Sequence, residues 1–242
     1  MRKVIASIKP AIFPVYSKEE IIGTCFICKS KHVITCAHVV ENSEEPIVEI
    51  NGKKVKLIPV FKDRSWDVAI CELSDDVFDY NFGLELGAYD DAAEGDDALM
   101  CGFPLGLGYH VTHKGMISAK DIINGRYSFQ IDASINRGNS GGPCIILKDG
   151  NPIVVGVIAT RLVDIDFTQL QDLANAFKEN GQRSSEKTTG KEITGSIARL
   201  MLTLTDHVGI TLNQFNRYLN VGFGEAVSID YVTHAINNIK RR

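Results

Sequence analysis

Short apolar segments recur along the chain up to about residue 160, each bounded by turn-forming or charged residues. They are rich in valine and isoleucine, which is typical of β-strands. Hairpin turns are expected at Asn51–Lys53, Ile123–Arg126 and Lys148–Pro152. The expected strands lie in VIASI, AIFPVY, IIGTCFI, HVITCA, PIVEI, KVKLIPVF, DVAICEL, DALMCGF, GMISA, YSFQIDA, PCIILK and PIVVGVIAT. So many strands with almost no helix between them predict antiparallel β-barrels or sandwiches, not a parallel α/β sheet.

The pattern changes between Asp164 and about Asn220, where apolar residues recur at three- and four-residue spacing. Leu170, Leu173 and Phe177 are an example, and this spacing is typical of helices. Beyond it, NVGFGEAVSI predicts one more strand and DYVTHAINNIKRR predicts a closing helix. We therefore expect a helical insertion over residues 164–219 of a β fold and a C-terminal helix over residues 230–242.

Charge and hydrophobicity exclude several classes of protein. The 30 acidic and 26 basic residues give a formal charge of -4, which argues against a nucleic-acid-binding surface. No apolar run reaches the roughly 18 residues that a membrane span needs, and no uninterrupted apolar leader occurs near the N-terminus. We therefore expect a cytoplasmic protein whose six cysteines remain reduced thiols and whose partners are proteins or peptides.

Three short motifs carry candidate chemistry, in the order TCAHVV with His38, SWDVAI with Asp67 and INRGNSGGP with Ser140. Glycine and other turn-forming residues around one serine predict a tight turn that exposes the hydroxyl and directs backbone N–H groups into one concavity. Acyl transfer to water needs a nucleophile, a base, a carboxylate that orients the base, and donors for the oxyanion. The chain offers a residue for each of these roles.

We assign Ser140 as the nucleophile, His38 as the general base and then acid, and Asp67 as the group that orients the imidazole. The backbone N–H groups of Gly138 and Ser140 are the expected oxyanion hole, with Asn139 between them. This chemistry requires no organic cofactor and no metal.

These motifs resemble those of trypsin-like serine endopeptidases of the chymotrypsin fold, and within them the HtrA/Deg branch. The stretch CGFPLGLGYHVTHKGMISA is also similar to that branch, and the resemblance covers residues 4–161 and 220–236. It implies two antiparallel six-stranded barrels with the triad between them. The N-terminal barrel would occupy residues 1–80, and the C-terminal barrel residues 90–163 and 220–232. HtrA-like relatives are often trimers, so a homo-oligomer is left open.

Three departures from these families matter. Asn139 stands where digestive trypsins have aspartate, so activation is not expected to require zymogen cleavage. The chain ends soon after the second barrel, so no PDZ domain is expected. The helical insertion at 164–219 either regulates access to the specificity pocket, docks a protein partner, or only caps the barrel.

The resemblance also points to residues that contact substrate. Ser134 falls at the pocket floor, where an acid would favour Lys or Arg, and Glu225 falls near the pocket wall, where it either favours a basic side chain or faces solvent. The strand that ends at Thr160 and Arg161 is expected to pair with the substrate backbone. The full expected substrate-binding set is Ser134, Ile135, Ala159, Thr160, Arg161 and Glu225.

Two alternatives remain open on the residues alone. In one, the chain is a protease-fold binding or scaffold module that acts through its helical insertion, with catalysis lost or conditional. In the other, the same machinery serves an esterase that acts on non-peptide acyl groups.

Overall fold

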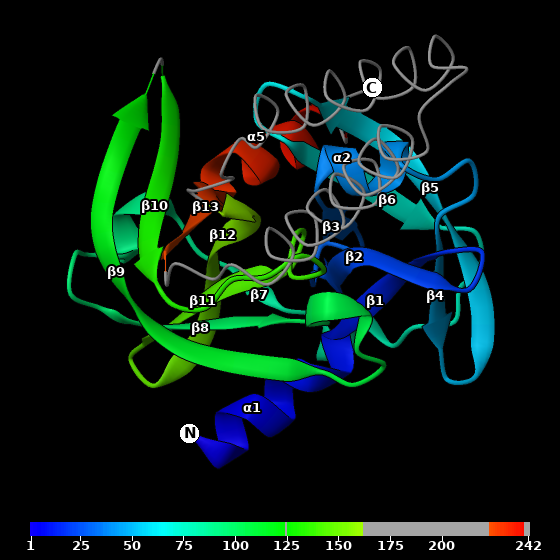
Figure 1. Cartoon of the computed structure of the whole chain (residues 1–242), viewed down its shortest axis with the longest axis horizontal. Coiled ribbons are helices and arrows are strands. Elements are labelled where there is room, and N and C mark those ends of the chain that lie inside the picture. The colour runs from blue at the N-terminus through cyan, green and yellow to red at the C-terminus, as the bar shows by residue number, and fades with distance from the viewer. Residues whose placement is uncertain (124, 162–222, 240–242) are drawn as a thin grey trace, which may run out of the picture. The chain divides into compact units, whose positions relative to one another are not determined.

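The computed structural model describes residues 1–123, 125–161 and 223–239, and antiparallel strands dominate it (Figure 1). The expected helical insertion at 164–219 lies outside the described residues, as do residues 240–242 of the C-terminal helix. No helix in the described part of the chain is long and apolar enough to cross a membrane.

The first barrel closes in the strand order β1-β2-β3-β6-β5-β4, with β1 and β4 joined at Tyr16 and Ile47. In the turn between β4 and β5, Asn51 and Gly52 have φ values of 53° and 77°, as the Asn-Gly hairpin signal predicts. Phe26, Ile34 and other buried side chains fill the barrel. Its strands are β1 (Ile12–Ser17), β2 (Glu20–Ile27), β3 (Val33–Thr35), β4 (Ile47–Ile50), β5 (Lys53–Asp63) and β6 (Val68–Leu73).

The second barrel contains six antiparallel strands in the order β11-β8-β9-β10-β13-β12, and the pairing of β11 with β12 closes it. A short seventh strand, β7 (Glu85–Leu86), runs parallel to β12. The barrel strands are β8 (Asp97–Gly102), β9 (Val111–Ile123), β10 (Arg126–Asp132), β11 (Pro143–Lys148), β12 (Asn151–Arg161) and β13 (Phe223–Ser228). The expectation of two six-stranded antiparallel barrels is therefore confirmed.

Among the residues that the structure describes, three α-helices accompany the barrels: α1 (Arg2–Ile8), α2 (Ala37–Glu41) and α5 (Ile229–Ile239). The closing helix is confirmed, but the strand expected at VIASI is wrong, because this segment forms α1. Val4 and Ile8 lie four residues apart, so a helix places both on one face, where Ile8 is buried. Short 3₁₀ turns occupy Lys9–Ala11, Tyr80–Phe82, Tyr89–Asp91 and Pro104–Gly106.

All six cysteines are buried free thiols, as expected. Cys25 and Cys28, which form the CxxC sequence, both lie in the core of the first barrel. The fold therefore uses these side chains as small apolar core residues.

The burial of Phe129 in the core of the second barrel can be tested by mutation. Phe129 is fully buried, whereas Phe82 is 56% exposed. We expect Phe129→Ala to lower the free energy of unfolding by about 3–5 kcal/mol, because it removes a buried ring and leaves a cavity. Phe82→Ala, the matched control, should change it by less than about 1 kcal/mol. Urea unfolding followed by fluorescence measures both, and equal effects would contradict the packing described.

Candidate active site

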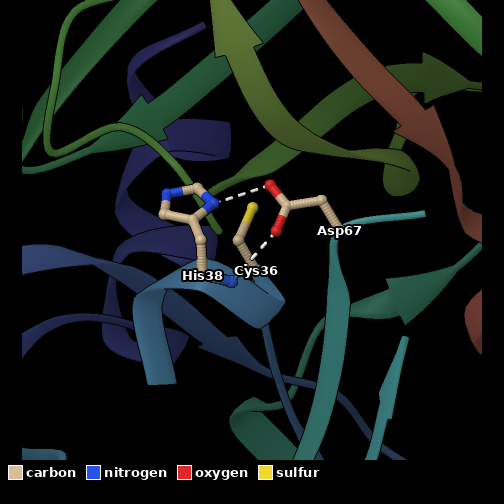
Figure 2. Close-up of side chains that lie close together, drawn as sticks. All are labelled: Cys36, His38 and Asp67. Carbon is tan, nitrogen blue, oxygen red and sulfur yellow. Dashed lines mark hydrogen bonds and ion pairs between the residues drawn. The ribbon is translucent and has the colours of Figure 1, made fainter. Parts of the chain in front are cut away.

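His38 and Asp67 form a two-point contact in the first barrel (Figure 2). His38 lies in α2, directly after β3, and Asp67 lies immediately before β6. His38 Nδ1 is 2.6 Å from Asp67 Oδ2, and the backbone N–H of His38 donates to Asp67 Oδ1 at 3.0 Å. With the Nδ1 proton held by the carboxylate, Nε2 is the nitrogen able to accept a proton.

The loop that carries Asp67 is fixed by the C-terminal helix α5. Asp63 Oδ1 accepts from the backbone N–H groups of Ser65 and Trp66, and Asp63 Oδ2 accepts from the Tyr231 hydroxyl of α5. Trp66 and Tyr231 also stack, with ring centroids 4.4 Å apart. Burial acts to raise the pKa of Asp63, but the hydrogen bonds from Tyr231, Trp66 and Ser65 outweigh it and lower that pKa. These contacts fix the residues that directly precede Asp67, which itself has a left-handed conformation with φ of 52°.

The segment before Ser140 is a turn in which Asn139 N–H donates to Asn136 O at 3.0 Å and Gly138 has φ of 95°. A positive φ at the third residue of such a turn is typical of type II. Arg137 O accepts from Leu105 N–H at 2.7 Å. Because the peptide bond is trans, the N–H of Gly138 points away from Leu105.

The backbone N–H groups of Gly138 and Ser140, on either side of Asn139, have no hydrogen-bond acceptor among the described residues. Asn139 O accepts from Gly142 N–H at 2.9 Å, which directs the N–H of Ser140 to the opposite side of that peptide. Ser140 is half-buried, and within the described residues its hydroxyl makes no hydrogen bond to His38. Such contacts often tighten only when substrate binds. The turn therefore offers two unpaired donors beside one hydroxyl.

Thr24 of β2 fastens this turn to the first barrel. Its N–H donates to Ser140 O at 2.9 Å, and its hydroxyl donates to Gly138 O at 2.6 Å and accepts from Phe103 N–H at 3.0 Å. Sequence reasoning missed Thr24 and the N–H of Leu105, because a threonine in a strand and a backbone donor carry no motif. Only the pairing of distant segments identifies them.

The structure places the expected substrate-binding residues in different environments. Ser134 is exposed, whereas Ile135 and Ala159 are buried. Thr160 and Arg161 end β12 and pair with Glu225 and Gly224 of β13. The roles expected for these residues remain predictions.

Glu225 is neither solvent-facing nor free. Its carboxylate lies 3.1 Å from Arg126 Nη2, and its side chain is only 17% exposed. This ion pair compensates the charge that was expected to favour a basic substrate side chain.

Asn139 is 1% exposed, and its side-chain amide has no hydrogen-bond partner in the described part of the chain. A neutral amide at this position gives a newly formed N-terminus no carboxylate with which to pair.

Comparison with known proteins gives a family match. The profile of the trypsin-like peptidase domain matches residues 23–157. A probable periplasmic DegP-like serine endoprotease of Buchnera aphidicola is 29% identical over 213 residues, covering 79% of this chain and 44% of the relative. A putative mitochondrial Do-like protease of Arabidopsis thaliana is 30% identical over 233 residues, covering 87% of this chain and 41% of the relative. The chain thus spans less than half the length of these curated relatives.

Solved structures show the same fold. The HtrA-type protease AlgW, solved with a decapeptide, superposes with a TM-score of 0.67 at 18% identity, covering 100% of this chain and 67% of AlgW. The active form of the Rv3671c protease from M. tuberculosis has a TM-score of 0.57 at 28% identity, covering 66% of this chain and 74% of the Rv3671c chain.

The expected cytoplasmic location is wrong, because relatives from several bacteria are named periplasmic endoproteases. The expectation depended on the first residues of the chain and on reduced cysteines. Buried thiols persist in any compartment, so they do not identify one.

Thr24 provides a test of the contact between the barrels. We expect Thr24→Val to lower kcat/KM about 10-fold or more, because it leaves Gly138 O and Phe103 N–H without their partner. Thr233→Val is the control, since the Thr233 hydroxyl has no partner among the described residues. Hydrolysis of a casein substrate measures both, and full activity of Thr24→Val would refute the role of this hydroxyl.

Gly138 provides a test of the donor turn. A Cβ at Gly138 would lie 2.3 Å from Phe103 O, so Gly138→Ala must displace the turn. We expect kcat to fall about 100- to 1,000-fold, the effect of losing an oxyanion donor. Gly150→Ala is the matched control, because Gly150 also has positive φ, of 81°, but open space around it. Steady-state kinetics separates the two, and similar losses in both variants would point to general strain.

Proposed function

The chain belongs to the trypsin-like peptidase family, and on this premise we propose that it is a serine endopeptidase of the HtrA/Deg type. The observation that carries the proposal is the combination of two features at one site. These are the two-point contact between His38 and Asp67, and the two unpaired N–H groups that flank Asn139 beside the Ser140 hydroxyl.

In the proposed reaction the Ser140 hydroxyl attacks the carbonyl carbon of the scissile peptide bond, and His38 Nε2 accepts its proton. Asp67 stabilises the resulting imidazolium through the contact at Nδ1. The N–H groups of Gly138 and Ser140 donate to the oxyanion. His38 then protonates the leaving amine, and an acyl group remains on Ser140. Water, activated by His38 in the same way, releases it.

Peptides are the substrate class that this fold favours. β12 ends at Arg161, and an extended peptide that pairs with this strand would acquire main-chain hydrogen bonds. The AlgW structure contains a decapeptide, which supports the same class here. The ion pair of Glu225 with Arg126 supports a preference other than strict Lys or Arg.

Activation without zymogen cleavage is part of the proposal. In digestive relatives an aspartate at the position of Asn139 pairs with a newly released N-terminus, and an amide carries no charge for such a pair. In this chain the turn is held instead by the N–H of Leu105 and by Thr24.

We further propose that the enzyme works outside the cytoplasm, as the names of its bacterial relatives say of them. The free thiols fit this location because every one of the six is buried and therefore shielded from disulfide exchange.

A fluorophosphonate probe tests the proposal on the uncleaved chain. We expect wild type and Ser7→Ala to be labelled and Ser140→Ala to remain unlabelled, because only the activated hydroxyl attacks phosphorus. Intact mass spectrometry should show the label on a chain that retains its N-terminal residues.

Two results would contradict the proposal. A wild-type chain that is folded by circular dichroism but unlabelled would refute the peptidase and favour a binding module. Labelling that appears only after N-terminal residues are removed would refute activation without cleavage.

A further inference from the structure

A third side chain lies against the His38–Asp67 pair. Cys36 directly precedes α2, and its sulfur, a ring nitrogen of His38 and an Asp67 carboxylate oxygen all lie within 4.8 Å of one another (Figure 2). Cys36 is fully buried, and its thiol donates to Ile158 O at 3.2 Å. The proposed peptidase reaction gives this thiol no role.

We propose that Cys36, His38 and Asp67 form a binding site for a soft divalent cation of the zinc class, and that occupation of this site inhibits the peptidase. The inhibitory part rests on the proposed function, whereas the binding part does not. A thiolate sulfur, an imidazole nitrogen and a carboxylate oxygen are the three donor types that zinc takes in proteins. The sulfur favours zinc or cobalt over magnesium or calcium, which prefer oxygen ligands.

The three donor atoms lie within 4.8 Å of one another, so an ion requires the Cys36 sulfur to move in by up to about 1 Å and the Asp67 carboxylate to turn. Bonds of about 2.0–2.3 Å to a tetrahedral ion place the ligand atoms about 3.3–3.7 Å apart. His38 Nδ1 and Asp67 Oδ2 are now 2.6 Å apart, so the carboxylate must move away from the ring by less than about 1 Å. The hydrogen bond from His38 N–H to Asp67 Oδ1 gives a point about which it can turn. The fourth position is left for water.

In the absence of metal, the site remains compatible with catalysis. The Cys36 thiol donates to Ile158 O and leaves the 2.6 Å contact between His38 Nδ1 and Asp67 Oδ2 in place. The His38 side chain is 42% exposed, so an ion can reach the imidazole from solvent.

Binding would block the reaction through the imidazole tautomer. The ion takes Nδ1 as a ligand, so the ring proton must reside on Nε2, and the Cys36 thiol releases its proton to solvent. A protonated Nε2 cannot accept the proton of Ser140. The thiolate and the carboxylate balance the two charges of the ion, so the occupied site buries no net charge.

Zinc inhibition of the full chain is the first test. With ZnCl₂ we expect wild-type hydrolysis of casein to fall and to recover on addition of EDTA. In Cys36→Ser the zinc concentration for half-inhibition should rise at least about 10-fold, each variant being compared with its own zinc-free rate. Cys71→Ser is the matched control, since Cys71 is also fully buried in the first barrel but lies outside the cluster, and its zinc sensitivity should equal that of wild type.

Cobalt binding tests the site without reference to activity. Added to Ser140→Ala, Co²⁺ should give a near-ultraviolet thiolate-to-cobalt charge-transfer band, and the band should be lost in the double variant Ser140→Ala/Cys36→Ser. Absence of the band in the first protein would overturn the site even if the enzyme proves active. Zinc inhibition equal in Cys36→Ser and wild type would overturn the mechanism, because the ion would then act elsewhere. A chain without peptidase activity that still shows the band would refute the proposed function and retain the site.

Discussion

The contact on which the candidate site depends is the attachment of the Ser140 turn to Thr24. His38 and Asp67 belong to the first barrel, while Ser140 belongs to the second, so no local geometry within either barrel aligns all three. The backbone N–H and the hydroxyl of Thr24 bind the carbonyls of Ser140 and Gly138. These bonds fix the carbonyls of Gly138 and Ser140, whereas the bonds of Arg137 O to Leu105 N–H and of Asn139 O to Gly142 N–H set the directions of the Gly138 and Ser140 N–H groups.

The loop that carries Asp67 is also contacted by a segment from outside the first barrel. Its positive φ is unusual for a residue with a side chain, and such a conformation persists only where neighbours determine it. Here the neighbour is α5, which follows the last strand of the second barrel and supplies Tyr231 to the loop of the first. Thus Thr24 of the first barrel contacts the Ser140 turn, and α5, which follows the second barrel, contacts the loop that carries Asp67. The residues that support the candidate site therefore come from segments far apart in the sequence.

Cys36 shows how one side chain can add a second property to such a site. As a protonated thiol it packs as a small apolar residue and leaves the His38–Asp67 contact intact. As a thiolate it would complete a set of ligands that only a soft cation satisfies. In the proposed scheme both states use the same imidazole, which would serve either the Ser140 nucleophile or a metal ion and not both at once.

Much of the fold followed from the sequence because strands, hairpin turns and the GNSGGP turn are encoded by neighbouring residues. The alternation of apolar runs with turn residues predicted the two barrels, and the order of His38, Asp67 and Ser140 predicted the chemistry. The short run VIASI was assigned wrongly, because over so few residues apolar spacing does not separate helix from strand. The expected cytoplasmic location was also wrong, because buried thiols carry no information about the compartment in which a protein works.

Only the tertiary structure decided which residues support the site. Thr24 and Gly138 are 114 positions apart, and the pairing of Glu225 with Arg126 and the approach of Cys36 to Asp67 likewise depend on how the strands close. Local sequence determines the conformation a segment prefers, whereas hydrogen bonds and ion pairs between distant segments form only after closure of the barrels has fixed their distances.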